Sequence, residues 1–230
     1  MSPASRPVRD LSGNLPWRMV TGDMQTNPEH VASEAEAAAE RIAGIVCETP
    51  LRRSSAFSDR VGADVYFKLE NRQHTGSFKL RGAANCLMTL SAEQRSAGCV
   101  AASSGNHGAA VAYAMRELGV QGVIFVPEQT SQVKIDAIRG YGGDVRFFGT
   151  DGLDTELHAR EFADEHGMFY LSPYNDPEVV ASPWAAACGG ITVLMKKLRI
   201  GIEDVKNIYL AGAFGTYTDL DNATRLGIFP

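Results

Sequence analysis

The sequence predicts an α/β protein, built on a parallel sheet with helices on both faces. Two observations carry this prediction. Short apolar runs recur along the 230 residues, and segments of about ten or more residues with helical character separate them. Short apolar strands that alternate with helices are typical of right-handed βαβ units on a parallel sheet. No internal repeat interrupts this alternation.

The elements follow in a regular order. A first helix is predicted from Asn27, which can cap it, with Pro28 in the first helical position and an alanine-rich stretch behind it. The predicted strands cover residues 65–70, 99–103, 122–127, 144–149 and 168–172. The predicted helices that separate them begin at Ser77, Gly108, Ser131 and Asp154.

Composition and charge exclude several classes of function. Hydrophobic residues make up 44% and charged residues 21% of the chain, which is ordinary for a globular protein. A net charge of -5 without a Lys/Arg run argues against a nucleic-acid partner. No apolar run reaches the roughly 20 residues that span a bilayer, and residues 1–26 look like a loose leader. The cysteines are scattered, which predicts reduced thiols in a cytoplasmic protein; they are Cys47, Cys86, Cys99 and Cys188.

Two motifs fall where loops enter helices, the edge at which parallel sheets bind ligands. In "SSGNHGAA" (residues 103–110), Gly105 and Gly108 allow a close approach of the backbone, and Ser104 and Asn106 offer donors and acceptors. A plain helix cap explains this motif about equally well.

The second motif, "HTGSFKLRG" (residues 74–82), places Lys79 between two apolar residues at the start of a helix. A lysine on a solvated helix face is the alternative. The two motifs together favour Schiff-base chemistry, in which a partly desolvated amine acts near an anion-favouring loop.

Four segments occur in the order and spacing of a known family; they are "KLENRQHTGSFKLRGA", "ASSGNHGAAVAYA", "VPEQTSQVKIDAIRGYGGDV" and "SPYNDPEVVA". Over about residues 31–181 the chain resembles the pyridoxal-phosphate enzymes of the threonine dehydratase and serine racemase family. The resemblance implies the fold-type II (tryptophan synthase beta-like) fold and the cofactor pyridoxal 5'-phosphate. It also implies deamination of a hydroxy amino acid such as serine or threonine, with racemisation as the neighbouring outcome.

The resemblance also implies roles for individual residues. Lys79 matches the lysine that forms the Schiff base with the cofactor and moves the α proton. Phe78 matches a residue that helps place the cofactor ring, and Asn106 one that bonds the cofactor's 3′-oxygen. Ser104 matches the acid or base on the opposite face in racemases. The substrate carboxylate is expected on the loop formed by Ser103, Ser104, Gly105, Asn106 and His107.

The resemblance stops near Ala181, because the family's phosphate-binding run of glycines is absent there. We expect an incomplete large domain over 27–97 and 171–182, a small inserted αβ domain over 98–170, and a segment of different origin over 183–230. That last segment, with "YLAGAFGTY", resembles the end of the ATPase domain in reductive activators of corrinoid proteins. A non-catalytic remnant and an accessory protein of corrinoid activation therefore stay open as alternatives to a lyase.

The remaining expectations concern ligands and partners. His158, Glu161 and Glu165 share one helical face, but a solvated face explains them better than a metal site. The expected partner is a small-molecule amino acid rather than nucleic acid or a membrane. Assembly of several copies of this chain is left open.

Overall fold

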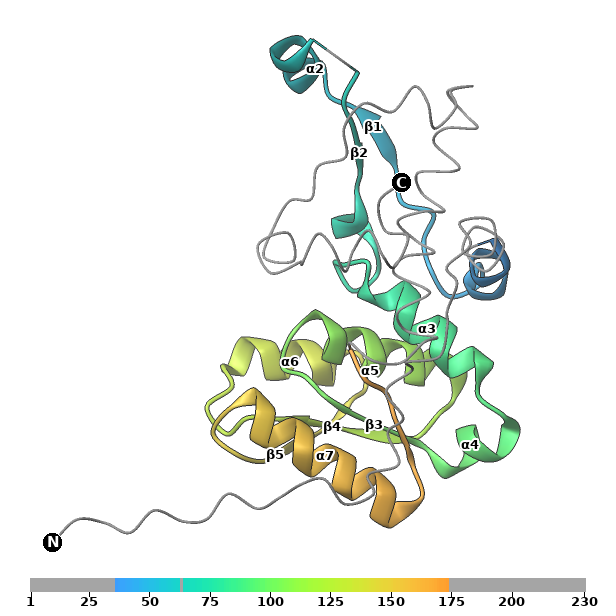
Figure 1. Cartoon of the computed structure of the whole chain (residues 1–230), viewed down its shortest axis with the longest axis vertical. Coiled ribbons are helices and arrows are strands. Elements are labelled where there is room, and N and C mark those ends of the chain that lie inside the picture. Colours follow the sequence, from blue (N-terminus) through green and yellow to red (C-terminus); the bar gives the residue numbers. More distant parts are fainter. Residues whose placement is uncertain (1–35, 63, 174–230) are drawn as a thin grey trace, which may run out of the picture.

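A parallel sheet of four strands forms the centre of the structure (Figure 1). The computed structural model describes residues 36–62 and 64–173. The strands lie in the order β5-β4-β3-β6, and all their pairings are parallel. Their bounds are β3 (Cys99–Ala102), β4 (Gly122–Val126), β5 (Asp144–Phe147) and β6 (Phe169–Tyr170). The predicted fold class is confirmed, and each of these strands lies within a predicted one.

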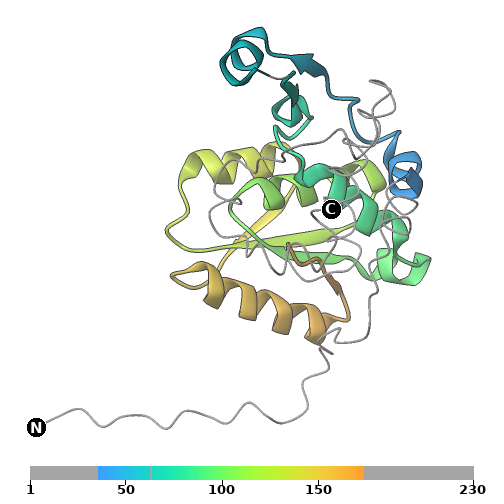
Figure 2. The same ribbon diagram turned by 45° about the horizontal axis from the view of Figure 1, so that its top comes forward.

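Helices cover both faces of this sheet, as predicted. The helices are α3 (Lys79–Thr89), α4 (Ala92–Ala97), α5 (Asn106–Leu118), α6 (Gln132–Gly140) and α7 (Gly152–His166). Figure 2 shows α3, α5 and α6 on one side of the sheet and α7 on the other. The helix expected from Ser131 is α6, with Ser131 at its N-cap position. The helix expected from Asp154 begins two residues earlier, because the carboxylate of its N-cap, Asp151, accepts from the N–H groups of Leu153 and Asp154. The short helix α4 was not predicted.

The two faces of the sheet bury separate groups of side chains, because successive residues of a strand point to opposite faces. Ala101 and Ile124 belong to the larger cluster, with side chains of α3, α5 and α6. Val100 and Phe125 belong to a smaller cluster with Ala159 of α7 and others. This two-sided burial explains why the strands read as continuous apolar runs.

A second, smaller sheet departs from the prediction. It pairs β1 (Leu51–Arg53) with β2 (Tyr66–Lys68) in antiparallel register, with Leu51 opposite Lys68. The prediction that residues 65–70 belong to the parallel sheet is therefore wrong. A parallel neighbour needs a crossover that packs on the sheet, and α2 (Ser55–Val61) buries Ser58 alone. Figure 1 shows this pair and α2 projecting from the main sheet.

Several predictions lie at or beyond the limits of the described residues. Residues 36–42 are helical, with Ala38 and Ile42 buried, whereas the predicted cap Asn27 lies outside the described part. The segment 183–230 lies outside it as well. Leu80 and Val111, from the two predicted domains, share the larger buried cluster, and the division into domains stays a prediction. Within the described part of the chain, no helix has the length and apolar character that crossing a membrane requires.

Candidate functional site

The loop between β3 and α5 forms one wall of a cavity. Ser103, Ser104 and Gly105 of this loop, together with Asn106 and His107 at the start of α5, line a cavity of about 390 Å³. The backbone N–H of Gly105 donates to the Ser103 hydroxyl at 3.2 Å, which folds the loop before the helix begins. The first turn of α5 therefore faces the cavity, and its free N–H groups favour an anion there.

The two glycines of this loop have different roles. A Cβ atom at Gly108 would lie 2.1 Å from the Ser103 carbonyl oxygen, a backbone atom that cannot move aside. At Gly105 the nearest atom to such a Cβ is the Ser103 hydroxyl, at 3.9 Å. Internal packing of the loop against α5 therefore requires glycine at 108, and the close approach to a ligand expected there stays a prediction.

Lys79 lies at the first position of α3 and lines the same cavity. Leu80 and Leu87 of the same helix, both fully buried, anchor α3 in the larger buried cluster. Burial lowers the pKa of the Lys79 amine below its ordinary value. Partial loss of solvent thus makes this lysine a better nucleophile than an exposed one. The two sequence motifs meet at one site, as a shared function requires.

Phe78 differs from the other predicted site residues, because the described lining of the cavity does not include it. Its ring is half-buried, and the Lys79 nitrogen lies 5.4 Å from the ring centroid. Phe78 thus contacts the lysine rather than the cavity, and its expected contact with a cofactor ring stays a prediction.

His107 is buried and ties the loop to the end of β6. Its Nε2 lies 3.1 Å from the carbonyl oxygen of Leu171, and a carbonyl only accepts, so Nε2 carries the hydrogen. Burial lowers the pKa of His107 to about 4, the bond to Leu171 opposes this, and the charge of Lys79 adds to the lowering. His107 is therefore a neutral donor at pH 7 that positions the loop.

The sequence prediction missed the other walls. Ala102 is the last residue of β3, and Pro127 and Pro173 follow the ends of β4 and β6, so the cavity opens at the carboxyl edge of the parallel sheet. Gly152, Thr155 and Glu156 come from the first turn of α7. A signal for the strand-end residues was available, because Ala102, Pro127 and Pro173 lie at or just after the carboxyl ends of predicted strands, the edge where ligands bind.

The predicted solvated face of α7 is wrong for His158. Its ring stacks on Phe148, with 3.6 Å between centroids, and meets Phe125 edge-on at 4.9 Å. Among the described residues, no three His, Cys, Asp or Glu side chains form a group that could hold a metal.

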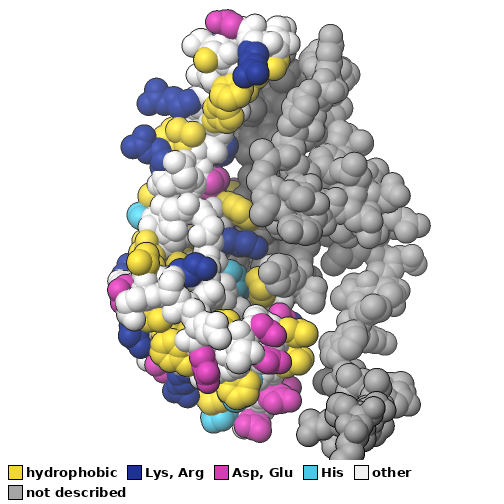
Figure 3. Space-filling model, turned by 90° about the vertical axis from the view of Figure 1, so that its left-hand side faces the viewer, with side chains coloured by type: hydrophobic (Ala, Val, Ile, Leu, Met, Phe, Trp, Pro, Cys, Tyr) yellow, Lys and Arg dark blue, Asp and Glu magenta, His cyan; other side chains and the backbone are white. Residues whose placement is uncertain are grey.

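On the face shown in Figure 3, Lys and Arg side chains are interspersed with acidic and hydrophobic ones.

Comparisons with known proteins show which family the chain resembles. A family model described as "Pyridoxal-phosphate dependent enzyme" matches residues 42–191, ten residues past the end of the resemblance noted from sequence. The biosynthetic L-threonine dehydratase of Haemophilus influenzae is 32% identical and covers 90% of this chain and 46% of its own length. An alignment over 90% of the chain must extend past Ala181 into the segment 183–230.

Solved structures show the same relationship. Threonine deaminase isoform 2 of Solanum lycopersicum superposes with a TM-score of 0.69 at 34% identity, over 78% of this chain and 50% of that one. Serine racemase of Dictyostelium discoideum superposes with a TM-score of 0.65 at 33% identity, over 77% of this chain and 54% of that one. The chain spans about half the length of the curated relatives it matches.

Proposed function

This chain belongs to the family of pyridoxal-phosphate dependent enzymes. We propose that it supplies the part of an ammonia-lyase active site that contains Lys79, and that the substrate is a hydroxy amino acid such as threonine or serine. The observation that carries the proposal is the meeting of Lys79 with residues 103–107 around one cavity. The dehydratases among its relatives support this reaction class.

The described residues fit pyridoxal 5'-phosphate. Lys79 offers a half-buried amine with a lowered pKa, and the first turns of α3, α5 and α7 face the cavity. Such N-termini suit an anionic group. The hydroxyls of Thr75 and Ser77, in the loop that leads to Lys79, are buried without a hydrogen-bond partner among the described residues. Buried hydroxyls are normally paired, so these two hydroxyls can form hydrogen bonds with a bound ligand.

Each side chain has a separate role in the proposed reaction. Lys79 holds the cofactor and moves the α proton of the substrate, for which a lowered pKa is an advantage. The loop 103–107 binds the substrate carboxylate through its N–H groups and hydroxyls, and Asn106 bonds the cofactor's 3′-oxygen. Phe78 helps to place the ring. The cofactor, when bound, supplies the electron sink for the carbanion. The net reaction converts the hydroxy amino acid to a keto acid and ammonia.

Racemisation is the second candidate, and Ser104 is the residue that favours it. Ser104 lines the cavity with Lys79, and a hydroxyl on the opposite face of the substrate could return the α proton there. The similarity to a serine racemase supports this candidate. Measuring keto acid and inverted amino acid from the same incubation separates the two outcomes.

A third candidate function, based on the segment 183–230, is that of an accessory protein of corrinoid activation. The resemblance of "YLAGAFGTY" to an ATPase domain is its sole support. The long alignment with a dehydratase favours a lyase origin for at least part of this segment. A cytoplasmic location and assembly with further copies complete the proposal; the thiols of Cys47, Cys86 and Cys99 are in keeping with a reducing compartment.

Reduction with borohydride after incubation with pyridoxal phosphate tests the proposal. Peptide mapping should place the phosphopyridoxyl group on Lys79, because burial lowers its pKa and more of its amine is neutral than in an exposed lysine. The variant Lys79→Ala should lose the label, and Lys134→Ala, on the exposed face of α6, should keep it. Label spread over Lys68, Lys134 and Lys196 would contradict the assignment. A chain without label would be the non-catalytic remnant.

A further inference from the structure

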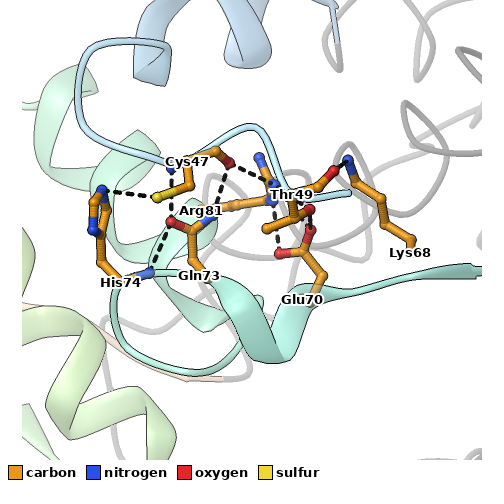
Figure 4. Close-up of polar contacts among 7 residues, drawn as sticks. All are labelled: Cys47, Thr49, Lys68, Glu70, Gln73, His74 and Arg81. Carbon is orange, nitrogen blue, oxygen red and sulfur yellow. Dashed lines mark hydrogen bonds and ion pairs between the residues drawn. The ribbon is translucent and has the colours of Figure 1, made fainter. Parts of the chain in front are cut away.

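A cysteine outside the cavity is held in place by a buried glutamine (Figure 4). The backbone N–H of Cys47 donates to Oε1 of Gln73 at 2.8 Å, and Nε2 of Gln73 donates to the Cys47 carbonyl at 3.1 Å. The guanidinium of Arg81 donates to the same carbonyl at 3.3 Å. Gln73 is buried. The backbone of Cys47 is thereby fixed against the loop that leads to Lys79.

The thiol of Cys47 meets an imidazole that is fixed as well. Its sulfur lies 3.1 Å from Nε2 of His74. The His74 ring stacks on Tyr113 of α5, with 5.1 Å between centroids and 13° between planes. The hydroxyl of Tyr141 donates to the His74 carbonyl at 3.0 Å. Tyr113 of α5 thus holds the ring beside the sulfur, and Tyr141, the residue after α6, holds the backbone of His74.

The pair is also within reach of solvent. Cys47 is partly exposed and His74 is exposed, whereas Cys86 and Cys99 are fully buried. A thiolate is the nucleophilic form of cysteine, and an ordinary thiol is only about 3% ionised at pH 7. An adjacent imidazole that accepts the proton overcomes this limit.

We propose that Cys47 and His74 form a reactive thiol–imidazole pair, a site of modification by low-molecular-weight disulfides. His74 Nε2 accepts the proton of the Cys47 thiol as the sulfur attacks one sulfur of the disulfide. The disulfide bond of the reagent breaks, a bond forms between Cys47 and the attacked half, and the other half leaves as a thiolate that takes the proton from His74. The product is a mixed disulfide on Cys47.

The charged and titratable groups around this pair come from four segments. Arg81 of α3 bonds the Cys47 carbonyl and is paired with Glu70. Tyr113 of α5 stacks on His74, and Arg116 lies over the Tyr113 ring. Tyr141 bonds the His74 carbonyl, and Glu117 pairs with Arg116. Among these groups, His74 is the base in contact with the sulfur.

Glutathione disulfide and the full chain provide the first test. After a short incubation at pH 7, peptide mapping by mass spectrometry should find the mixed disulfide on Cys47, while Cys86 and Cys99 stay unmodified in the folded protein. Cys188 lies outside the described residues, so the Cys188→Ser variant is measured in parallel. Modification of Cys86 or Cys99 at the same rate as Cys47 would overturn the proposal.

The variant His74→Gln tests the role of the imidazole. At pH 7 it should slow modification of Cys47 about three- to tenfold, within the thirtyfold ceiling set by an ordinary thiol's ionisation. Near pH 10, where thiols ionise without help, its rate should equal that of the wild type. The control His166→Gln, on α7, should leave the rate unchanged at both values. An equal rate at pH 7, or an undiminished deficit near pH 10, would show that His74 is not the base.

Discussion

The parallel sheet and the projecting β1–α2–β2 arm differ in how they are stabilised. Strand residues such as Val100 and Ile124 are fully buried between helices on two faces. In the arm, by contrast, Phe57, Val61 and Phe67 are 50%, 60% and 41% exposed. The hydrophobic effect scales with apolar area removed from water, so it stabilises the sheet far more than the arm.

Polar contacts compensate for this difference where the arm joins α3. Arg81 of α3 donates through Nε and Nη2 to the two carboxylate oxygens of Glu70, at 3.0 and 2.8 Å, and Thr49 donates to the same carboxylate (Figure 4). Lys68, the last residue of β2, donates to the Thr49 carbonyl at 2.7 Å. Arg81 lies two residues after Lys79, so the helix that presents the lysine is anchored in both regions.

Truncating one side chain in each region gives the sharpest contrast. Ile124→Ala should lower the free energy of unfolding by about 2–5 kcal/mol, because it leaves a cavity between sheet and helices. Phe67→Ala should lower it by less than about 1 kcal/mol, because much of the ring is already in water. Urea unfolding of the full chain measures the loss of stability in both variants. The control Ile124→Val, which removes less of the side chain, should lower the free energy of unfolding by about 0.5–1.5 kcal/mol. Equal losses at the two sites would abolish the distinction drawn above.

Acid should weaken the sheet region through His107. Its folded pKa of about 4 lies below the ordinary 6.5, so the folded state prefers the neutral ring, mainly because of burial. Stability is therefore full above about pH 6.5 and falls as the pH drops toward 4, by about 3 kcal/mol from this group. The slope of unfolding free energy against pH should flatten in His107→Asn and persist in His166→Asn. A slope unchanged in His107→Asn would show that another group is responsible.

These contrasts also explain which features the sequence could predict. The strands around Val100 and Ile124 are apolar on both faces, and that pattern is local, so strand positions and the order of elements were predictable. Lys79 and Asn106 could be named because their motifs are contiguous. The antiparallel pairing of β1 with β2 was missed because no local pattern reports which strand lies alongside.

The site residues that the sequence did not predict were missed for the same reason. Glu156 of α7 and Pro173, just after β6, lie far along the chain from Lys79, and the tertiary fold brings them to the same cavity. Packing also places constraints on two of the positions that the sequence analysis named. Gly108 is required by contact with Ser103, and His158 lies between aromatic rings. Such contacts depend on the tertiary structure, and periodicity along the chain does not report them.

The ion pair at the base of the arm should have a smaller effect on stability than Ile124 or His107. Burial alone would raise the pKa of Glu70, but hydrogen bonds from Arg81 and Thr49 and the charge of Arg81 outweigh it and lower the pKa below 4.5. The stabilisation is therefore present above about pH 4.5 and lost as the pH falls through the folded pKa. Glu70→Gln should lower the free energy of unfolding by about 1 kcal/mol at pH 7, and the difference from wild type should shrink toward pH 3.5. Asp64→Asn, which removes the exposed partner of Arg53 in the same arm, should change stability by less than about 0.5 kcal/mol. If the two variants lose the same stability at every pH, the Glu70–Arg81 contact contributes no more than a surface pair, and the arm is held by its backbone pairing alone.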